Sequence, residues 1–582
     1  MSKQTILLIV FGALFAGLTI ALNIPEWVYV LFKNDVFADE LGLSIHKFYS
    51  YPQKSILFQL NGDFLLLFLL LLYFQRHPIT LKVAAFLLPI SYLLLLYYNC
   101  YYYLYQGFYS VHPIFKNDWI IIRDILPTFL NEVSVKKASY LAILAIIVLF
   151  SFLCWKGISY MSNVFRRITL GKSAWLFIAL MPAWMGLSIL SLEKENFINE
   201  EINFTNKSFY IKWTLPNLLK SWTLERKEPL AHLKKRLIYD LYLEKPLQQK
   251  PNIYLLFIES YGAVATLADE CAPQFDSLST ILEKQLQEKG WYSSSNYSKS
   301  TVIGGRSWLA LTTTMIGARI EDQIQYNGLL EEHQGFPHMV AYFNQQGYET
   351  IRASTMSSKN IDTLKMLTIP NQFWGFDQRK LFSDIPYQGY RYDYYGGIPD
   401  QYTLGYLQEN IMDTLNTPYF FTFITMNSHG PWSNGPPITT NWQDLNALKN
   451  PFPNGRPTLN MSILQYWNLV EYELKTITNF ILDHPKDNSL FIVLGDHNPA
   501  GLEWKLFDKF DKWATPIHII GKDSTLIQSF EQHGFTKGMQ VDTSQFTIMR
   551  HMGLHSLLTR QLLENYGKEE EILPEYLPWG LK

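Results

Sequence analysis

Long runs of apolar residues constrain this chain more than any other feature of its sequence. About 20 mostly apolar residues are needed to cross the hydrocarbon core of a bilayer. Five runs near the N-terminus reach that length: residues 5–23, 56–74, 81–103, 138–160 and 174–192. The sequence therefore predicts a domain of five transmembrane helices over residues 1–195. Asn61 and Asp63, near the start of the second run, lie either at the membrane interface or toward a polar cavity.

Basic residues beside the runs predict how the domain is oriented. Lys3 precedes the first run, Arg76 and Lys82 separate the second from the third, and further basic residues lie in 166–172. Because Lys and Arg accumulate on the cytoplasmic side, we expect a cytoplasmic N-terminus and an external chain after the fifth run. The first run lacks a small-residue cleavage site, so we expect a retained span in the plasma membrane rather than a signal peptide.

The charge and cysteine content argue against two classes of protein, nucleic-acid-binding proteins and disulfide-stabilised domains. Charged residues make up 17% of the chain and the net charge is −2, so no basic face for a nucleic acid is expected. Cys100, Cys154 and Cys271 provide no disulfide framework.

We expect residues 196–250 to form a helical linker, in which 230–245 shows helical spacing of Leu, Ile and Tyr among basic residues. That helix either lies on the membrane surface or packs on the domain that follows.

Residues 251–582 show the pattern of an α/β domain. Short apolar runs are each followed by a polar or glycine-containing turn and then a helical pattern; the clearest are 252–260, 348–354, 419–430, 489–497 and 515–522. This alternation predicts a mostly parallel sheet with helices on both faces. Because such sheets present their functional groups at the carboxyl ends of the strands, the residues that end each run are the candidates.

Acidic and imidazole side chains follow three of these runs. Glu259 ends the first, His429 follows the third, and the pair Asp496–His497 ends the fourth. Each alone has an ordinary explanation as a helix cap, a structural histidine or a turn residue. Together they form a set of oxygen and nitrogen ligands for one divalent metal ion, Zn²⁺ or Mn²⁺, with Mg²⁺ as the alternative.

The segment STVIGGRSWLALTTT, residues 300–314, has the features of a nucleophile turn. Gly304 and Gly305 allow close backbone approach, Arg306 can bind anionic oxygen, and Ser307 opens a helical pattern. A serine bonded there to a divalent cation would be an alkoxide nucleophile at neutral pH. The alternative is that Ser307 only caps the helix. Ser300, Thr301 and Thr312–Thr314 are the competing hydroxyls.

The order of these motifs resembles the alkaline phosphatase superfamily. The motifs are IYLLFIESYG, then GGRS before a helix, then a strand with NSHGPW, then a strand with LGDH. Within the superfamily the chain is most similar to the membrane-anchored, sulfatase-like branch. That branch holds lipoteichoic acid synthases, phosphoglycerol transferases and phosphoethanolamine transferases, and its domain order is also similar.

The resemblance implies roles for individual residues. One metal ion would be held by Glu259, Ser307, Asp496 and His497, with Ser307 as the covalent nucleophile. His429 would contact the phosphate or protonate the leaving group. Arg306 would neutralise charge on the transferred group, at a position where the related enzymes often have Lys.

Three departures from the related proteins affect specificity. The synthases have a histidine after the strand that matches 348–354, where this chain has Arg352, Ala353 and Ser354, so head-group recognition is expected to differ. Phosphoethanolamine transferases usually have a Thr nucleophile and disulfides, unlike Ser307 and the lone Cys271. Sulfatases proper need C/S-x-P-x-R for conversion to formylglycine, whereas Trp-Leu-Ala-Leu follows Ser307.

These features favour a membrane-bound transferase. It would move a phospho-head group, of the phosphoglycerol or phosphoethanolamine type, from a membrane phospholipid donor through Ser307 to an envelope glycan or lipid acceptor. A phosphodiesterase or sulfuric-ester hydrolase would use the same chemistry with water as the acceptor. A non-catalytic membrane scaffold or sensor would be favoured by loss of a ligand or of the nucleophile, and none is lost.

Overall fold

The computed structural model describes most of the chain after residue 234 and three long helices before it. The described residues are 3–33, 64, 78–109, 115, 118–119, 137–167, 230, 233, 235–332, 334–355, 369–392, 397–430, 432, 434–450, 462–483, 486, 488–502, 510–541, 549–568, 573 and 575–581. The chain forms two compact units, Met1–Arg226 and Lys227–Lys582.

The first unit contains α1 (Lys3–Lys33), α4 (Pro78–Tyr109) and α6 (Lys137–Arg166). These helices pack through buried apolar side chains, among them Phe15 of α1, Tyr92 of α4 and Ile158 of α6. The hydroxyl of Tyr92 donates to the carbonyl of Leu18 at 2.8 Å, which satisfies a polar group inside this apolar contact. The three helices therefore share one core.

Helices occupy three of the five expected spans, namely 5–23, 81–103 and 138–160. Within the described part of the chain, one helix, Lys3–Pro25, has the length and the apolar character needed to cross a bilayer. The runs 56–74 and 174–192 and the basic loop residues 168–172 lie outside the described residues. The count of five spans and their orientation therefore stay predictions.

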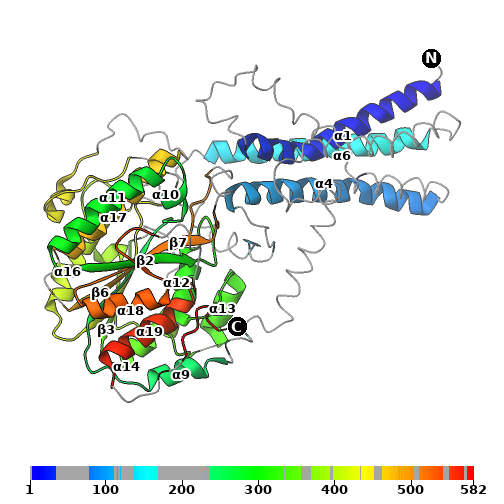
Figure 1. Ribbon diagram of the computed structural model, residues 1–582. Helices are drawn as coiled ribbons and strands as arrows, with labels where there is room; N and C mark the ends of the chain where they lie inside the picture. Colours follow the sequence, from blue (N-terminus) through cyan, green and yellow to red (C-terminus); the bar gives the residue numbers. More distant parts are fainter. Residues whose placement is uncertain are drawn as a thin grey trace. The chain divides into compact units, whose positions relative to one another are not determined.

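A nine-stranded sheet forms the centre of the second unit (Figure 1). Its strands are β1 (Asn252–Ile258), β2 (Tyr292–Lys299), β3 (Glu349–Ser354), β4 (Gln378–Leu381), β5 (Tyr419–Ile424), β6 (Ser489–Gly495), β7 (Ala514–Gly521), β8 (Thr536–Lys537) and β9 (Met549–Arg550). The order is β4-β3-β5-β1-β6-β7-β2-β8, with β9 paired to β2. The strands from β4 to β6 are mutually parallel, whereas β7 runs antiparallel to both β6 and β2.

Helices cover both faces of this sheet. One face carries α9 (Leu237–Leu243), α12 (Ser307–Ile316), α13 (Gln323–Glu332), α14 (Met339–Gln345), α15 (Ile369–Trp374), α18 (Ser524–Ser529) and α19 (Gly553–Tyr566). The other carries α10 (Val264–Leu267), α11 (Ala272–Glu288), α16 (Asp400–Asn410) and α17 (Ile463–Leu482). The 3₁₀ turns are η5 (Phe382–Asp384), η6 (Met412–Thr414), η7 (Trp442–Ala447) and η9 (Phe530–His533).

The central strand explains why these runs are apolar at every position. Ile253, Leu255 and Phe257 of β1 point into the core on the α12 face. The residues between them, Tyr254, Leu256 and Ile258, point into the core on the α17 face. Because side chains alternate across a strand, a strand covered on both sides needs apolar residues throughout.

The predicted α/β fold of the second unit is confirmed, with two differences in the sheet. The five predicted strands are β1, β3, β5, β6 and β7. The sheet is mostly parallel, but it includes two antiparallel strands: β7 runs antiparallel to both β6 and β2, and β8 runs antiparallel to β2. We did not predict β2, whose sequence YSSSNYSK contains no apolar run although most of its residues are buried.

The helix expected in residues 230–245 packs on the second unit. Leu230, Leu233, Tyr239 and Tyr242 are buried in the core that includes α12, α14 and α19. The Tyr239 hydroxyl donates to the carbonyl of Gly317 at 2.7 Å. Of the two alternatives for this helix, the structure therefore shows the second.

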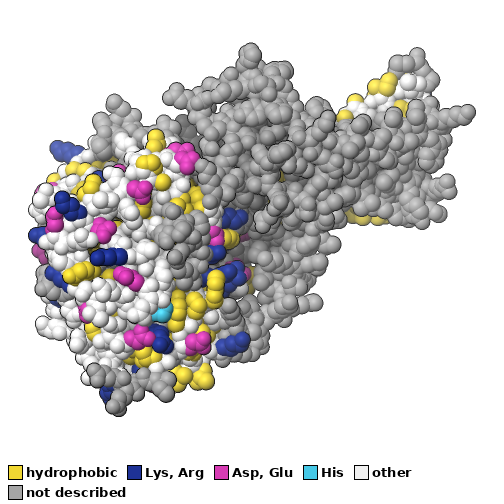
Figure 2. Space-filling model, in the orientation of Figure 1, with side chains coloured by type: hydrophobic (Ala, Val, Ile, Leu, Met, Phe, Trp, Pro, Cys, Tyr) yellow, Lys and Arg dark blue, Asp and Glu magenta, His cyan; other side chains and the backbone are white. Residues whose placement is uncertain are grey.

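The surface of the second unit carries both signs of charge. In the face that Figure 2 shows, Lys and Arg side chains alternate with Asp and Glu side chains over this unit. Cys100, Cys154 and Cys271 are unpaired.

Candidate active site

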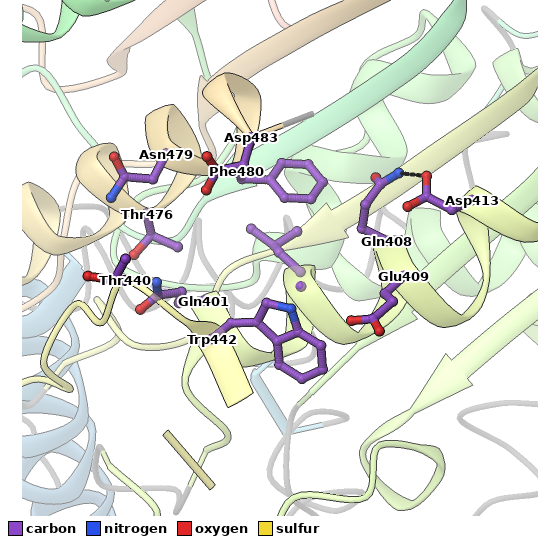
Figure 3. Close-up of a pocket in the computed structure, with 12 residues that line it drawn as sticks. Gln401, Gln408, Glu409, Asp413, Thr440, Trp442, Thr476, Asn479, Phe480 and Asp483 are labelled. Atoms are coloured by element: carbon purple, nitrogen blue, oxygen red, sulfur yellow. Dashed lines mark hydrogen bonds between the residues drawn. The ribbon is translucent and has the colours of Figure 1, made fainter. Parts of the chain in front are cut away.

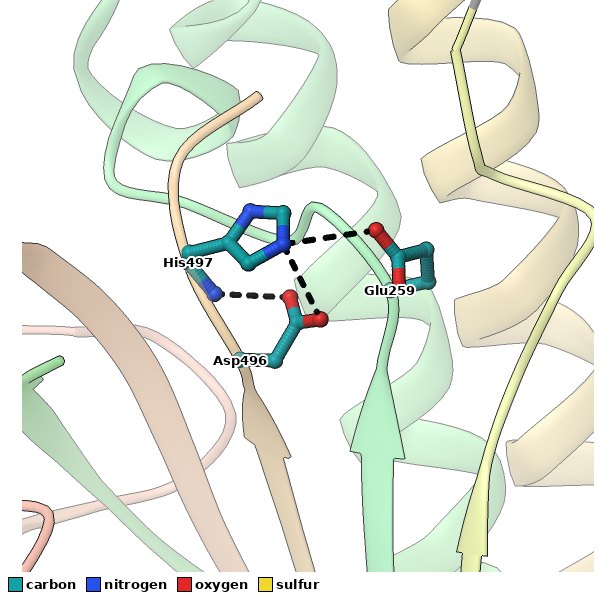
Figure 4. A group of neighbouring side chains, drawn as sticks. All are labelled: Glu259, Asp496 and His497. Carbon is teal, nitrogen blue, oxygen red and sulfur yellow. Dashed lines mark hydrogen bonds and ion pairs between the residues drawn. The ribbon is translucent and has the colours of Figure 1, made fainter. Parts of the chain in front are cut away.

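Glu259, Asp496 and His497 meet at the carboxyl ends of β1 and β6 (Figure 4). These two strands are parallel neighbours, and Ile258 lies opposite Gly495. The next residue of each strand is therefore a carboxylate, Glu259 on one and Asp496 on the other. His497 Nε2 lies 3.5 Å from Glu259 Oε1 and 3.4 Å from Asp496 Oδ2. All three side chains are buried.

Gly495 is glycine because another part of the backbone crosses it. A Cβ at this position would lie 1.7 Å from the carbonyl oxygen of Tyr261. The chain after β1 passes over the end of β6, and its Ser260 has a left-handed backbone with φ 61°. This crossing lets the Ser260 N–H donate to Asp496 Oδ1 at 2.7 Å. The glycine of the LGDH motif thus permits the contact that orients Asp496.

Gly495→Ala is expected to destabilise the second unit by about 3 kcal/mol, since the new methyl group must displace backbone. The same displacement would separate Asp496 from Ser260. Thermal unfolding of the purified protein measures the effect. Gly328→Ala, within α13, is the matched control. A Cβ at Gly328 would meet only Leu230 Cδ1, at 3.4 Å. That variant should be neutral or slightly stabilised; equal unfolding temperatures for both variants would contradict the steric explanation.

The two buried carboxyl groups strongly affect each other. Burial would raise the pKa of Glu259, but the charges of His429 and His497 and the hydrogen bond from Ser307 hold it below its ordinary value. Burial and the neighbouring Glu259 carboxylate hold the pKa of Asp496 well above its usual range. A site that keeps two carboxyls this close is stable with both ionised only if positive charge is added.

The tautomer of His497 indicates where that positive charge belongs. Its Nδ1 lies 2.9 Å from the carbonyl oxygen of Asn498, so Nδ1 carries the proton and donates it. Burial lowers the pKa of His497, against the opposing charge of Glu259, which favours the neutral ring. Nε2 then points a lone pair toward two carboxylate oxygens. Asp496 Oδ2 has no hydrogen-bond partner in the described structure.

A divalent cation fits this arrangement. Three lone-pair atoms converge within 4.8 Å of one another, and an imidazole whose other nitrogen donates to a carbonyl is the usual histidine ligand. Two carboxylate oxygens and one imidazole nitrogen suit Zn²⁺ or Mn²⁺.

Ser307 completes the group from the start of α12. Its Oγ donates to Glu259 Oε2 at 2.7 Å and lies 3.3 Å from His497 Nε2. The residue in the N-cap position is Arg306, and Ser307 is the first residue of the helix. The side chain of Ser307 is therefore directed at the carboxylate, and the alternative of a simple helix cap does not describe it.

An unusual turn places this helix start at the group. Gly304, Gly305 and Arg306 have φ values of 71°, 139° and 68°, so three successive residues have positive φ. Among the described residues, Arg306 and Ser260 are the two non-glycine residues with positive φ, and both flank the site. Such strain costs about 1–3 kcal/mol each and typically occurs at functional sites.

The competing hydroxyls make other contacts. Ser300 Oγ accepts from the N–H of Val302 at 3.3 Å, and Thr301 Oγ1 lies 3.3 Å from Thr313 Oγ1. Thr314 Oγ1 donates to the carbonyl of Ala310 at 2.9 Å within α12. These contacts direct the hydroxyls into the helix and its turn, away from the carboxylates.

His429 and Arg306 lie beside the group. His429 is in the turn after β5, and its charge helps to lower the pKa of Glu259, second only to the opposing effect of burial. Its Nδ1 lies 2.6 Å from the carbonyl oxygen of Gly430. Arg306 follows the glycine pair. Burial raises the pKa of Asp322, and the charge of Arg306 opposes that rise. Arg352 lies in β3, in register with Arg379 of β4.

Two supporting residues did not emerge from the sequence. Ser260 binds both carboxylates: its N–H donates to Asp496, and its Oγ donates to Glu259 Oε1 at 3.0 Å. Asn498 Nδ2 donates to the carbonyls of Lys512 and Ala514, at 2.7 and 2.8 Å, which fixes the chain after His497. The sequence signal for these two residues was their position, because Ser260 directly follows Glu259 and Asn498 directly follows His497.

A pocket of about 270 Å³ opens between α16, α17 and η7 (Figure 3). It is lined by Gln401, Leu404, Gly405, Gln408, Glu409, Asp413, Thr440, Trp442, Thr476, Asn479, Phe480 and Asp483. Three of these residues are acidic and none is basic, so an anionic phosphate group would be repelled. None of the predicted site residues lines this pocket.

Comparison with known proteins identifies one family. A family model described as Sulfatase matches residues 251–560, more than half of the chain. No curated protein matches. Phosphoethanolamine transferase EptA from Neisseria meningitidis is 14% identical, with 95% of each chain covered and a TM-score of 0.41.

Two further solved structures are similar. A protein of the alkaline phosphatase superfamily from Vibrio parahaemolyticus is 17% identical over 56% of this chain and 75% of that chain, with a TM-score of 0.36. Phosphoglycerol transferase GacH from Streptococcus pyogenes is 18% identical over 50% of this chain and 73% of that one, with a TM-score of 0.32. These TM-scores are low, and the assignment rests on the family model.

Proposed function

The chain belongs to the sulfatase family of the alkaline phosphatase superfamily, and from that premise we propose that it is a membrane-bound, metal-dependent phosphotransferase. It moves a phospho-head group, of the phosphoglycerol or phosphoethanolamine type, from a phospholipid to an envelope glycan or lipid. The observation that carries the proposal is the Ser307 hydroxyl, which donates to Glu259 Oε2 at 2.7 Å inside a group of metal-ligand type.

Glu259, Asp496, His497 and Ser307 would hold one divalent ion, Zn²⁺ or Mn²⁺, with Mg²⁺ as the alternative. When bound, the ion supplies positive charge that lowers the pKa of the serine hydroxyl and offsets charge on the phosphoryl oxygens. The residues present fit it, because they otherwise leave two carboxyls and a bare imidazole nitrogen facing one another.

The residues of the chain then divide the transfer into two steps. In the first, Ser307 Oγ forms a bond to phosphorus as its proton passes to Glu259 Oε2. The bond from phosphorus to the lipid oxygen breaks, and His429 protonates that oxygen so that the lipid leaves as an alcohol. In the second, an acceptor hydroxyl gives its proton to His429 and bonds to phosphorus. The Ser307–phosphorus bond breaks, and Glu259 returns the proton to Ser307.

Two neighbouring features support this chemistry. The first N–H groups of α12 point toward an anion bound at Ser307, as helix starts do. Arg306 adds a positive charge beside the transferred group. Because Trp308 and Leu309 follow Ser307 instead of the formylglycine motif, the serine acts unmodified, which favours phosphoryl over sulfuryl transfer.

The membrane part of the chain supports a lipid donor. Lys3–Pro25 is apolar over a length that crosses a bilayer. A hydrolase would share the first step and differ only in using water as the acceptor. The fate of the covalent intermediate therefore separates transferase from hydrolase.

Acid trapping followed by mass spectrometry tests the proposal. The full-length protein in detergent is mixed with phosphatidylglycerol or phosphatidylethanolamine, quenched in acid and digested. We expect the Ser307 peptide to gain the mass of the phospho-head group. An adduct on Thr301 would keep the mechanism and correct the residue. If metal-loaded protein forms no adduct with either lipid, covalent transfer from these donors is wrong.

The proposed topology predicts opposite labelling of two engineered cysteines. Thr440→Cys, at an exposed position of the second unit, should react with a membrane-impermeant maleimide in intact cells. Leu170→Cys, in the basic loop outside the described residues, should react only after permeabilisation. Native cysteines are replaced beforehand to remove background. Labelling of position 170 but not 440 in intact cells would reverse the orientation.

A further inference from the structure

The turn that carries His429 is tied to the reaction site by its own backbone. The N–H of His429 donates to the carbonyl of Met426 at 3.1 Å, which closes the turn over residues 426–429. Ser428 Oγ donates to the carbonyl of Glu259 at 2.6 Å, and Trp432 Nε1 donates to the carbonyl of Ser428 at 3.0 Å. The geometry of this turn therefore sets the positions of both His429 and Glu259.

A buried carboxylate also holds this turn. Asp400, the first residue of α16, is completely buried. Its Oδ2 accepts from the N–H groups of Met426 and Asn427, at 2.8 Å each. Its own N–H donates to Asn427 Oδ1 at 2.8 Å. Three hydrogen bonds thus fix the turn to the start of α16.

A second buried carboxyl lies against the first. Glu473 of α17 is completely buried, and the adjacent Tyr472 hydroxyl accepts from the N–H of Gln401, which joins α17 to α16. Burial, together with the nearby Asp400 carboxylate, holds the pKa of Glu473 well above its usual range. In the described structure neither Glu473 oxygen has a hydrogen-bond partner of normal geometry. An ionised carboxylate buried in that state would be strongly destabilised, so the neutral acid is the favoured form.

We propose that Glu473 is protonated and donates a hydrogen bond to Asp400, and that this acid pair positions the Met426–His429 turn for the reaction. Asp400 must be ionised to accept two backbone N–H groups strongly. Glu473 supplies the balancing donor without adding a second negative charge, which two buried carboxyls in contact could not sustain. Neither residue touches the substrate. The inference rests on the proposed role of His429 and extends it to the residues that hold it.

Variants of Glu473 test whether its donor matters. Glu473→Gln keeps a donor of nearly the same shape and should keep the wild-type rate on bis(p-nitrophenyl) phosphate, a simple phosphodiester. Glu473→Met keeps the length but removes the donor, so kcat should fall by roughly tenfold to a hundredfold with little change in KM, as expected for a misplaced reacting group. Glu471→Met is the matched control, since Glu471 pairs with Lys475 on the outer side of the same helix. Equal rates for the Gln and Met variants would overturn the proposal.

A double-mutant cycle separates positioning from general structural damage. In a His429→Ala background, Glu473→Met should lower kcat very little further, because its effect acts through His429. A full additional loss would show that the acid pair acts on stability alone and would overturn the positioning role.

Two measurements test the inference without any turnover, so its failure can be told apart from failure of the proposed function. Infrared spectroscopy should show the C=O stretch of a protonated buried carboxyl in the wild type and its loss in Glu473→Gln. Peptide mapping after diethylpyrocarbonate treatment should show faster modification of His429 in Glu473→Met. A missing carboxyl band, or an unchanged modification rate, would overturn the inference. If Glu473→Met does not fold, the infrared comparison still decides the protonation.

Discussion

Ser307→Ala is expected to lower kcat by roughly four to six orders of magnitude, as removal of the nucleophile does in other covalent enzymes. The covalent adduct should disappear with the activity. The variant removes the hydroxyl that reaches Glu259 Oε2 at 2.7 Å. The Ser260 hydroxyl donates to the other oxygen of this carboxylate, Oε1, at 3.0 Å, and so does not take the place of Ser307 at Oε2. The protein should stay folded, because losing one buried hydrogen bond costs only about 1–3 kcal/mol.

Ser300→Ala is the control for this result. Ser300 is close in sequence, but its Oγ accepts a hydrogen bond from the N–H of Val302. Its removal should leave the adduct and the rate nearly unchanged. Activity is followed by release of p-nitrophenol, and folding by circular dichroism and thermal unfolding. A folded Ser307→Ala protein that transfers at nearly the wild-type rate would rule out the covalent mechanism.

Removal of the metal ion is expected to abolish activity and to lower stability. Positive charge relieves the repulsion between Glu259 and Asp496, so an ion at about a hundredfold its Kd should stabilise the fold by about 2.7 kcal/mol. Chelation followed by addition of Zn²⁺, Mn²⁺ or Mg²⁺ should restore the unfolding temperature and the rate in parallel. If added metal restored the unfolding temperature but not the rate, or the rate but not the unfolding temperature, the metal site and the reaction site would be different sites.

Metal binding should also be pH-dependent, with a direction set by Asp496. Its pKa is raised well above the usual range, so at any pH below that pKa the metal-free protein holds a proton there that the ion must displace. Below that raised pKa, the apparent Kd should weaken by about tenfold for each unit of falling pH, with about one proton released per ion. Calorimetry in buffers of different ionisation enthalpy measures the proton count. An affinity independent of pH would contradict this assignment.

Asp496→Asn removes the charge of this side chain but keeps its shape. The amide oxygen can still accept from the N–H groups of Ser260 and His497, while one negative charge disappears. At a pH above the raised pKa of Asp496, where the wild-type carboxyl is charged, the metal-free variant should therefore be more stable than the metal-free wild type by about 1 kcal/mol or more. The variant should no longer respond to added metal. Asp511→Asn, at a partly exposed carboxylate paired with Lys299, should behave as the wild type.

The sequence predicted the strands that carry the site because those strands are buried on both faces. β1 and β6 read as continuous apolar runs, so the residues that end them, Glu259 and Asp496, could be found by position. Ser307 could be found because two glycines precede a helical pattern. β2 could not be found in this way, because its buried positions are mostly serines that show no apolar pattern.

Features that depend on contacts between distant residues could not be predicted. The crossing of Tyr261 over Gly495 is visible only once β1 and β6 are known to be neighbours. Asp400 and Glu473 lie on different helices, and their pairing depends on the packing of α16 against α17. The sequence did contain one indication of this pair. Glu473 lies among Tyr466, Val470 and Ile477 on the buried stripe of α17. A carboxyl on an apolar stripe indicates a buried partner.

The place of β1 in the sheet has a consequence for how the domain folds during synthesis. β1 is the first strand of the sheet to be made, yet it is central, and its partners are β5 and β6. Ile253 pairs with Phe420 and with Leu490, so its partners lie 167 and 237 residues later along the chain (420 minus 253, and 490 minus 253). Contacts of such high sequence separation form slowly, and both edges of an apolar strand stay unsatisfied until then. We therefore expect the newly made domain to depend on chaperones until β6 emerges, and a chain truncated before Ser489 to aggregate rather than to form a partial sheet.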